Sequence, residues 1–356
     1  MVMRWGLVVG SSAAVFLGLT YLSFLTVLMS GSAFGFWLGV EIGTVSFLVL
    51  CNSSTAVENE GSCKYYIIQG FSSVFLFVSL MVSTYAEAEP EGEVCASVFS
   101  FFMILMMWVK VGLFPFHFWV VPVLGRVGWG SWFWIAVVQK TSSFWVISSM
   151  SCEVGLIVLG GFSMVLTSLV GSLGGLGQMK IRAMMGYSSL VQSGWMGLLC
   201  LCKGLNLMIY SLVYGVIAWG LLVWMSQVNM VYTSCVHSLD GDLPNLWVYW
   251  MVPCSYFLSL AGSPPFMGFG LKLLALVMLL TYFWGFIVIL LVASGVSLYF
   301  YLSVFINGMV GLSSNKFKFG KSFMFTKSGL LSALFCLNFF GGFPLMWGVL
   351  CYGGFG

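Results

Sequence analysis

Long apolar runs, interrupted by short polar or Gly/Pro-rich segments, dominate the pattern of the sequence. Cutting the chain at these interruptions gives about eleven spans, most of them close to the ~20 residues that a helix needs to cross the ~30 Å hydrocarbon core of a membrane. The pattern predicts an all-α polytopic membrane protein that forms a single membrane domain over residues 1–356. The predicted spans are residues 6–29, 31–51, 64–84, 96–124, 131–150, 154–174, 185–203, 205–229, 247–281, 284–309 and 328–352.

Two of these spans are too long for one crossing and contain internal prolines. Pro115 and Pro122 lie within residues 96–124, and Pro264-Pro265 lies within residues 247–281. Because proline lacks an amide N–H and clashes with the preceding turn, it interrupts a helix. We predict that both spans are discontinuous helices whose breaks lie near the middle of the membrane.

The two broken spans also share a weak sequence repeat. One runs V-G-L-F-P-F from Val111, and the other runs A-G-S-P-P-F from Ala261. Paired broken helices in corresponding halves of a chain indicate the transport site of a transporter built from inverted repeats.

The glycine-rich segment at residues 171–177 does not match the spacing of a nucleotide-binding loop. We expect it to allow close packing of helices.

Composition limits the classes of protein that the sequence can represent. Of the 356 residues, 6% are charged and 60% are hydrophobic, whereas soluble domains carry roughly 25% charged residues. The net charge of +3 is small and the lysines are scattered, which argues against nucleic acid as a partner. We expect the partners to be lipid and other membrane subunits.

The cysteines and the charged loops change this picture only slightly. None of the ten cysteines forms a C-x-x-C pair, so we expect packing roles in preference to redox or metal chemistry. An excess of Lys and Arg marks the cytoplasmic or matrix side of a membrane protein. Only Lys203 lies on the side opposite the N-terminus, so this rule places the N-terminus on the matrix side if the membrane is mitochondrial. The nine basic residues on the N-terminal side are Arg4, Lys64, Arg126, Lys180, Arg182, Lys316, Lys318, Lys321 and Lys327.

Four ionisable residues lie inside apolar spans. They are Lys110 beside the first break, Lys140 ten residues into its span, Lys272 beside the second break, and Glu41 midway along the second span. Such a residue costs at least ~2.5 kcal/mol at membrane depth and usually lines a pathway or pairs with another charge. Two plainer alternatives remain open. A lysine near a helix end can extend to the interface, and Glu41 with Lys110 can form a purely structural ion pair.

Lysine at membrane depth suits proton transfer. Burial of an amine in an apolar environment favours its neutral form, and a nearby carboxylate favours its charged form. A lysine whose partner moves can therefore load and release a proton. We predict that Glu41 faces Lys110 across the interface of the second and fourth spans, close enough to favour the charged form of the lysine. His117, just after the first break, is a candidate bridge from Lys110 to water, although a histidine satisfied within the core is the simpler alternative. We assign no role to His237, which lies in a polar loop.

Three sequence blocks form a specific pattern along the chain. The first is K-V-G-L-F-P-F-H-F-W-V from Lys110, and the second runs from Gly174 through Y-S-S-L-V-Q-S-G-W-M to Met196. The third is L-S-L-A-G-S-P-P-F-M-G-F-G-L-K, which ends at Lys272. Together these blocks resemble the chain 2 family of mitochondrial NADH:ubiquinone oxidoreductase, respiratory complex I. The order and spacing of these blocks hold from about residue 35 to 305. The sequence departs from the family at Gln192, where a histidine is usual, and at Ala183, where a basic residue is usual.

The resemblance implies an antiporter-like inverted-repeat fold that lacks three N-terminal helices, with a core at about 31–309 and a C-terminal helix at about 328–352. It implies that Glu41, Lys110, Lys140 and Lys272 form a charged proton path in the mitochondrial inner membrane, with the C-terminus on the intermembrane side. No cofactor is expected in this chain. NADH, flavin, iron–sulfur clusters and ubiquinone are implied elsewhere in the complex. The alternatives are a subunit of a multi-subunit cation/proton antiporter and a structural scaffold with inactive lysines.

Overall fold

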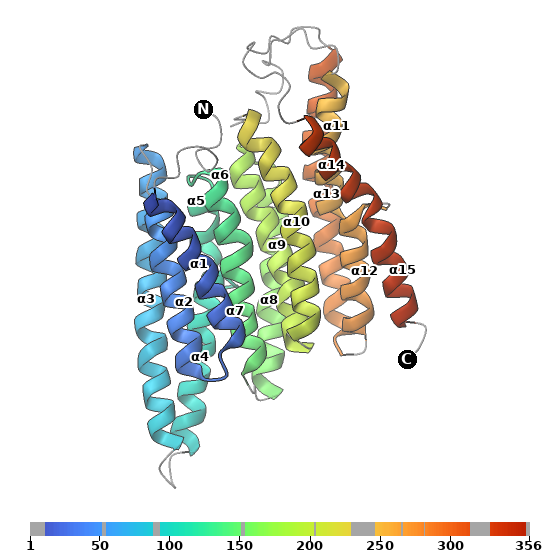
Figure 1. The fold of residues 1–356 in the computed structure, drawn as a ribbon. Helices are drawn as coiled ribbons and strands as arrows, with labels where there is room; N and C mark the ends of the chain where they lie inside the picture. The colour runs from blue at the N-terminus through green and yellow to red at the C-terminus, as the bar shows by residue number, and fades with distance from the viewer. Residues whose placement is uncertain are drawn as a thin grey trace. The chain divides into compact units, whose positions relative to one another are not determined.

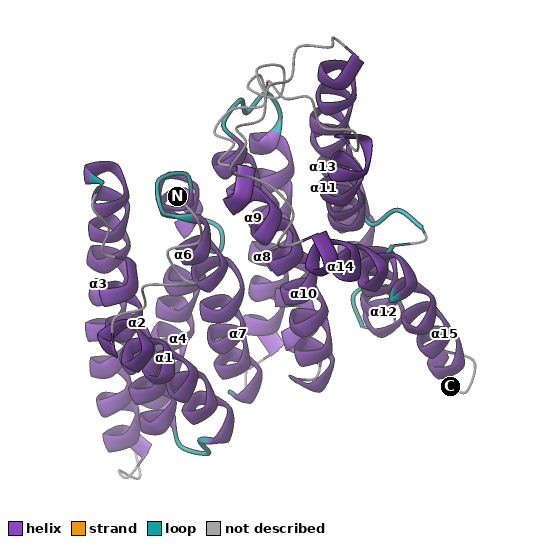
Figure 2. Ribbon diagram, turned by 45° about the horizontal axis from the view of Figure 1, so that its top comes forward, coloured by secondary structure: helices purple, strands orange, loops and turns teal. Residues whose placement is uncertain are grey.

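The computed structural model describes residues 11–51, 55–87, 93–150, 154–202, 204–228, 246–264, 266–280, 282–313 and 328–353. Contacts between residues divide the chain into two compact units. The first unit contains Met3–Thr167 and Met196–Leu207, and the second contains Ser168–Trp195 and Met208–Gly356. In the described residues the regular elements are helices (Figures 1 and 2), as the hydrophobic pattern predicts.

The first unit begins with two pairs of adjacent helices. Helix α1 (Ser11–Met29) packs along α2 (Ala33–Cys51), and α3 (Ala56–Glu87) packs along α4 (Glu93–Val111), as Figure 1 shows. Helix α3 begins two turns before the predicted residue 64. Polar residues occupy these added turns, and Lys64 Nζ lies 2.7 Å from Glu60 Oε1 one helical turn away. Hydropathy alone excluded this polar extension from the predicted span.

The fourth and fifth predicted spans are divided in the structure. After α4 come the 3₁₀ helix η1 (Phe116–Trp119) and the short helix α5 (Val120–Leu124), so the chain is interrupted around Pro115 as predicted. The fifth span was expected as one plain helix. It consists of α6 (Trp129–Phe133), the π-helical turn η2 (Trp134–Val138) and α7 (Gln139–Ser149). A π turn is a single-turn irregularity within a helix, and residues 134–138 contain no proline or glycine that would mark it in the sequence.

The remaining helices form most of the second unit. Helices α8 (Val154–Gly175) and α9 (Ile181–Cys202) each have residues in both units. The helices that follow are α10 (Gly204–Val228), α11 (Leu246–Ala261), α12 (Met267–Leu280), α13 (Trp284–Ser313), α14 (Ser328–Phe340) and α15 (Gly342–Gly353). The ninth predicted span is broken between α11 and α12, as expected. The last predicted span, expected as one helix, is divided at Gly341.

The glycine-rich segment at the end of α8 packs closely against neighbouring helices, as predicted. A Cβ placed on Gly171 would lie 2.9 Å from the carbonyl oxygen of Tyr187 on α9, and one placed on Gly175 would lie 2.7 Å from the ring of Phe300 on α13. Real Cβ atoms do not approach other atoms so closely. Glycine is therefore needed at both positions for these helices to pack as they do.

The lengths of the helices suit a membrane. Helices α11 and α12, the two halves of the second broken span, are each shorter than a full crossing, whereas α1 has the same 19 residues as α2. Six helical stretches of the described residues are long and apolar enough to cross: Ala33–Cys51, Ala56–Ala86, Ser97–Leu124, Gly155–Gly175, Asn206–Ser226 and Trp284–Ile306.

Candidate functional site

Lys110 lies in the last turn of α4, directly before the first break. Its Nζ lies 2.7 Å from Oε1 of Glu41 on α2, and the lysine side chain is 1% exposed while that of Glu41 is 22% exposed. The expected contact between the two residues is therefore present. An ammonium at this depth is stabilised by the carboxylate, because an unpaired buried charge costs several kcal/mol.

The backbone at the end of α4 explains how Lys110 is held. Gly112 has φ +79°, a left-handed conformation that favours glycine, and its N–H bonds the carbonyl of Trp108 at 2.9 Å. Two side chains satisfy the last carbonyls of the helix. Gln69 of α3 donates to Lys110 O at 3.1 Å, and the indole of Trp119 donates to Val109 O at 3.0 Å. Lys110 is thus fixed by its backbone as well as by its ion pair.

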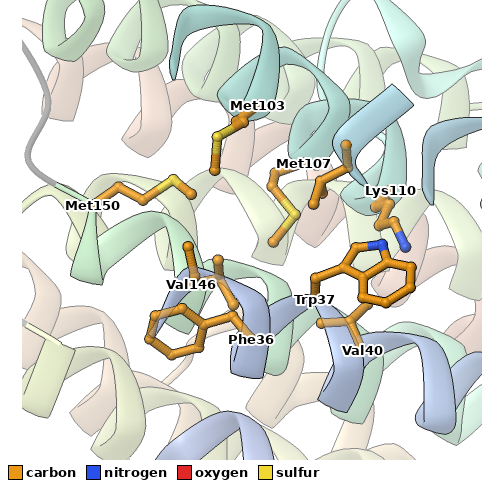
Figure 3. Close-up of a pocket in the computed structure, with 10 residues that line it drawn as sticks. Phe36, Trp37, Val40, Met103, Met107, Lys110, Val146 and Met150 are labelled. Atoms are coloured by element: carbon orange, nitrogen blue, oxygen red, sulfur yellow. The ribbon is translucent and has the colours of Figure 1, made fainter. Parts of the chain in front are cut away.

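One side of Lys110 faces a small apolar pocket (Figure 3). Lys110 is one of the residues that line the pocket, and its ammonium is bonded to Glu41. Few groups on this side can carry a proton. The other lining residues come from α2, α3, α4, α7 and the residue directly after α7, and they are Ala33, Phe36, Trp37, Val40, Leu76, Met103, Met107, Val146 and Met150.

His117 lies in η1 with a buried ring that packs against two aromatic side chains. The ring centroid is 5.8 Å from that of Phe114 and 4.1 Å from that of Phe118. Its Nδ1 has no hydrogen-bond partner among the described residues. This environment resembles that of a core histidine, the simpler of the two alternatives. A bridge from His117 to Lys110 stays a prediction.

Lys140 is the second residue of α7 and is 2% exposed. It lies two residues after the end of the π turn, whose extra residue per turn changes the direction in which the next side chains leave the helix. The preceding residue, Gln139, lines a second pocket that is more polar than the one beside Lys110. Hydroxyl groups of Thr20 and Ser23 on α1 and of Ser142 on α7 contribute to that lining.

Lys272 lies in α12, after the second break. Its Nζ donates a hydrogen bond to the carbonyl of Ala261, the last residue of α11, and the lysine is 8% exposed. In the described residues no carboxylate forms an ion pair with it. Gly262 follows Ala261 with φ +81°, so the chain turns away from the helix there and leaves the carbonyl available to the lysine.

Sequence reasoning missed a second polar contact at this break. Gln192 of α9 is buried, accepts a 2.6 Å hydrogen bond from Tyr210 Oη, and donates to Leu260 O at 3.5 Å. The sequence marked Gln192 only as a departure from its family pattern. A buried amide within an apolar helix was the signal that could have identified it, since such groups need partners.

Several residues considered in the sequence lie outside the described residues or have side chains that are not described. The described cysteines include Cys51, Cys200 and Cys254, which are buried as packing residues would be. No group of three metal-binding side chains occurs in the part of the chain that the structure describes. The residues outside it are Arg4, Cys152, Lys203, His237, Asp240, Asp242, Pro265, Lys316, Lys318, Lys321 and Lys327.

The fold and the buried lysines define a class of transport-related membrane protein, and comparison with known proteins agrees. A family profile described as "NADH:quinone oxidoreductase/Mrp antiporter, TM" matches residues 30–297. The chain therefore belongs to the NADH:quinone oxidoreductase/Mrp antiporter transmembrane family.

Curated relatives within this family carry a more particular name. The chain is 30% identical over 338 residues to NADH-ubiquinone oxidoreductase chain 2 of Branchiostoma floridae, which covers 93% of this chain and 95% of the relative. It is 29% identical over 292 residues to the chain 2 protein of Anopheles gambiae, and the aligned region covers 81% of this chain and 83% of the relative. The resemblance found in the three sequence blocks is confirmed.

Solved structures share the fold. A chain of respiratory complex I from Thermus thermophilus superposes with a TM-score of 0.79 at 20% identity, covering 95% of this chain and 79% of that one. A chain of the Mrp complex from Dietzia superposes with a TM-score of 0.67 at 16% identity, and the superposition covers 86% of this chain and 60% of that one. The predicted antiporter-like fold is confirmed.

Proposed function

We propose that the chain is a proton-translocating membrane subunit of a respiratory complex I in the mitochondrial inner membrane. Its partners are the other membrane subunits of the complex. These neighbouring subunits oxidise NADH and reduce ubiquinone with flavin and iron–sulfur clusters, and this chain holds no redox centre. The similarity over more than nine tenths of a curated chain 2 protein supports the proposal. The basic residues favour an N-terminus on the matrix side.

The proton path runs through Glu41, Lys110, Lys140 and Lys272. The observation that carries this proposal is the partly buried ion pair of Lys110 with Glu41 at the end of a broken helix. While the carboxylate is close, the amine holds its proton; when the carboxylate moves away, the amine in its apolar surroundings releases it. Lys140 and Lys272 are further buried amines that can accept and pass on the proton.

A cation/proton antiporter subunit is the second candidate, supported by the shared fold of the Mrp complex. Such a subunit would exchange a metal cation for protons without NADH oxidation. The chain covers only 60% of the Mrp chain but 95% of a chain 2 relative, which favours the first proposal. Co-purification with flavin and iron–sulfur proteins in one assembly distinguishes the two candidates.

Replacing Lys140 in the assembled complex tests the path. Lys140→Ala removes a buried amine, so we expect vesicles containing this variant to lose proton uptake together with much of their NADH oxidation. Lys140→Arg should also fail, because a guanidinium does not release its proton. Lys64→Ala, at an exposed lysine of α3, is the matched control and should pump normally. Normal pumping by an intact Lys140→Ala complex would show that Lys140 is structural.

A further inference from the structure

Asn338 is a buried amide on a C-terminal helix whose other described residues are largely apolar. It lies in α14, is 1% exposed, and falls beyond the matched family region, which ends at residue 297. Burying an amide without a hydrogen bond is costly. An asparagine at such a position therefore needs partners, and those partners indicate what the side chain does.

Both partners of Asn338 are serines on α11. Its Nδ2 donates to Ser255 Oγ at 3.4 Å, and its Oδ1 accepts a hydrogen bond from Ser259 Oγ. Ser255 and Ser259 are four residues apart, so they lie on the same face of the helix. One amide thus bridges two successive turns of α11 and fixes the lateral position of its C-terminal end.

That end of α11 is the break that holds Lys272. The carbonyl of Ser259 accepts the N–H of Gly262 at 2.9 Å. The next two carbonyls, of Leu260 and Ala261, accept hydrogen bonds from Gln192 and from the ammonium of Lys272. Three consecutive residues of α11 are therefore tied to α14, α9 and α12 respectively.

The C-terminal helices also hold the other half of the break. A Cβ placed on Gly341, between α14 and α15, would lie 2.8 Å from Cε of Met267, the first residue of α12. One placed on Gly270 of α12 would lie 2.8 Å from Cβ of Leu345 on α15. The pair α14–α15 thus contacts α11 before the break and α12 after it.

We propose that Asn338 is a positioning residue for Lys272. By fixing Ser255 and Ser259, it holds the end of α11 so that the carbonyl of Ala261 meets the ammonium of Lys272. The helix pair α14–α15 then holds the two halves of the broken helix, α11 and α12, in position. This inference rests on the proposed function, because it treats Lys272 as a member of the proton path.

Two substitutions in the assembled complex test the proposal. Asn338→Leu removes the amide at nearly constant size, and Ser259→Ala removes one of its partners with minimal change in volume. Leu337→Ala, at an exposed position of the same helix, is the matched control. The measurements are the amount of assembled complex and the proton uptake and NADH oxidation per assembled complex in vesicles.

We expect both variants to lower proton uptake per assembled complex by roughly fivefold, the factor that corresponds to the net free energy of one hydrogen bond. The control should change neither the amount of assembled complex nor its proton uptake. Asn338→Gln, which keeps the amide, should recover part of the loss. A purely structural asparagine would lower only the amount of assembled complex, and that result in both variants would overturn the proposal. If Asn338→Leu fails to assemble, Ser259→Ala decides the outcome.

A Lys272→Met variant separates this inference from the proposed function. If that variant pumps normally, Lys272 is not part of the proton path and the proposed role of this lysine fails. If it stops pumping while Asn338→Leu and Ser259→Ala pump normally per assembled complex, the proton path stands and only the positioning role of Asn338 is rejected.

Discussion

The two helix breaks hold their lysines with different kinds of partner. At the first break, Lys110 precedes the interruption and bonds a side-chain carboxylate on another helix. At the second, Lys272 follows the interruption and bonds a backbone carbonyl of the same broken helix. The glycines are alike, because Gly112 and Gly262 both adopt positive φ directly after the end of the first helical half.

This difference bears on how each lysine can change its protonation. A carboxylate on α2 moves away from Lys110 when α2 shifts against α4, and its negative charge then no longer favours the ammonium. A backbone carbonyl carries only a partial charge and moves only if the break itself rearranges. Movement of a neighbouring helix should therefore change the protonation of Lys110. Only a rearrangement of the break itself should change the protonation of Lys272.

The largest expected difference is in stability after removal of each ammonium. Lys110→Met leaves Glu41 without its cation, which should lower the unfolding free energy by about 3 kcal/mol, the low end for a broken buried pair because Glu41 is partly exposed. Lys272→Met leaves one carbonyl unpaired and should cost about 1–2 kcal/mol. Thermal unfolding of the assembled complex measures both. Equal losses would mean that the carboxylate contributes nothing beyond an ordinary acceptor.

The glycines sharpen the comparison. Alanine at a positive φ should cost about 1–2 kcal/mol at either break. At Gly112 the new methyl group would strike the stiff side chain of Val120, so stability should fall most there. At Gly262 it would lie 2.8 Å from Nζ of Lys272, which can swing away, so proton uptake should fall more than stability.

Helical glycines with open space around them provide the controls for this pair. Gly70→Ala in α3 and Gly295→Ala in α13 have nothing within 4 Å of the added methyl group, and they should be neutral or slightly stabilising. Thermal unfolding and proton uptake are measured for all four variants. A Gly262→Ala complex that unfolds early but pumps normally would contradict the close coupling of Lys272 to its break.

Glu41→Gln should give a smaller change in stability than Lys110→Met. The amide still offers Lys110 an oxygen acceptor, and an amine in apolar surroundings avoids the cost of an unpaired charge by losing its proton. The loss should therefore be only about 1 kcal/mol, the extra strength of a charge-assisted bond. Proton uptake should nevertheless fall, since a neutral partner no longer distinguishes the two protonation states of the lysine. A double-mutant cycle with Lys110→Met measures the coupling. A coupling energy near zero would remove the contrast between the two breaks.

The smallest effect is expected at the ion pairs near the start of α3. Arg126 and Lys64 both contact Glu60, and all three side chains are at least one-third exposed. Exposed pairs of this kind contribute about 0–1 kcal/mol, so Arg126→Gln should barely change thermal unfolding or proton uptake. A loss comparable to that of Lys110→Met would show that these surface charges belong to the functional site.

Several structural features around the buried lysines could be predicted from the sequence. Lysines within apolar spans are conspicuous because a charge in hydrocarbon is costly, and prolines within long spans mark breaks because they remove a backbone hydrogen bond. The contact of Glu41 with Lys110 was also predicted. The π turn before Lys140, the division at Gly341, the hydrogen bonds of Gln192 and the serine partners of Asn338 were not.

The sequence by itself determined the helical class, the two proline breaks and the buried ionisable residues, because these follow from local composition and from the cost of placing charge or unpaired backbone in lipid. Only the tertiary structure decided that Lys272 bonds the carbonyl of Ala261 and which amides hold the breaks. Those contacts join residues far apart in the chain, such as Asn338 and Ser259, and their geometry depends on how whole helices pack, which no short segment of sequence encodes.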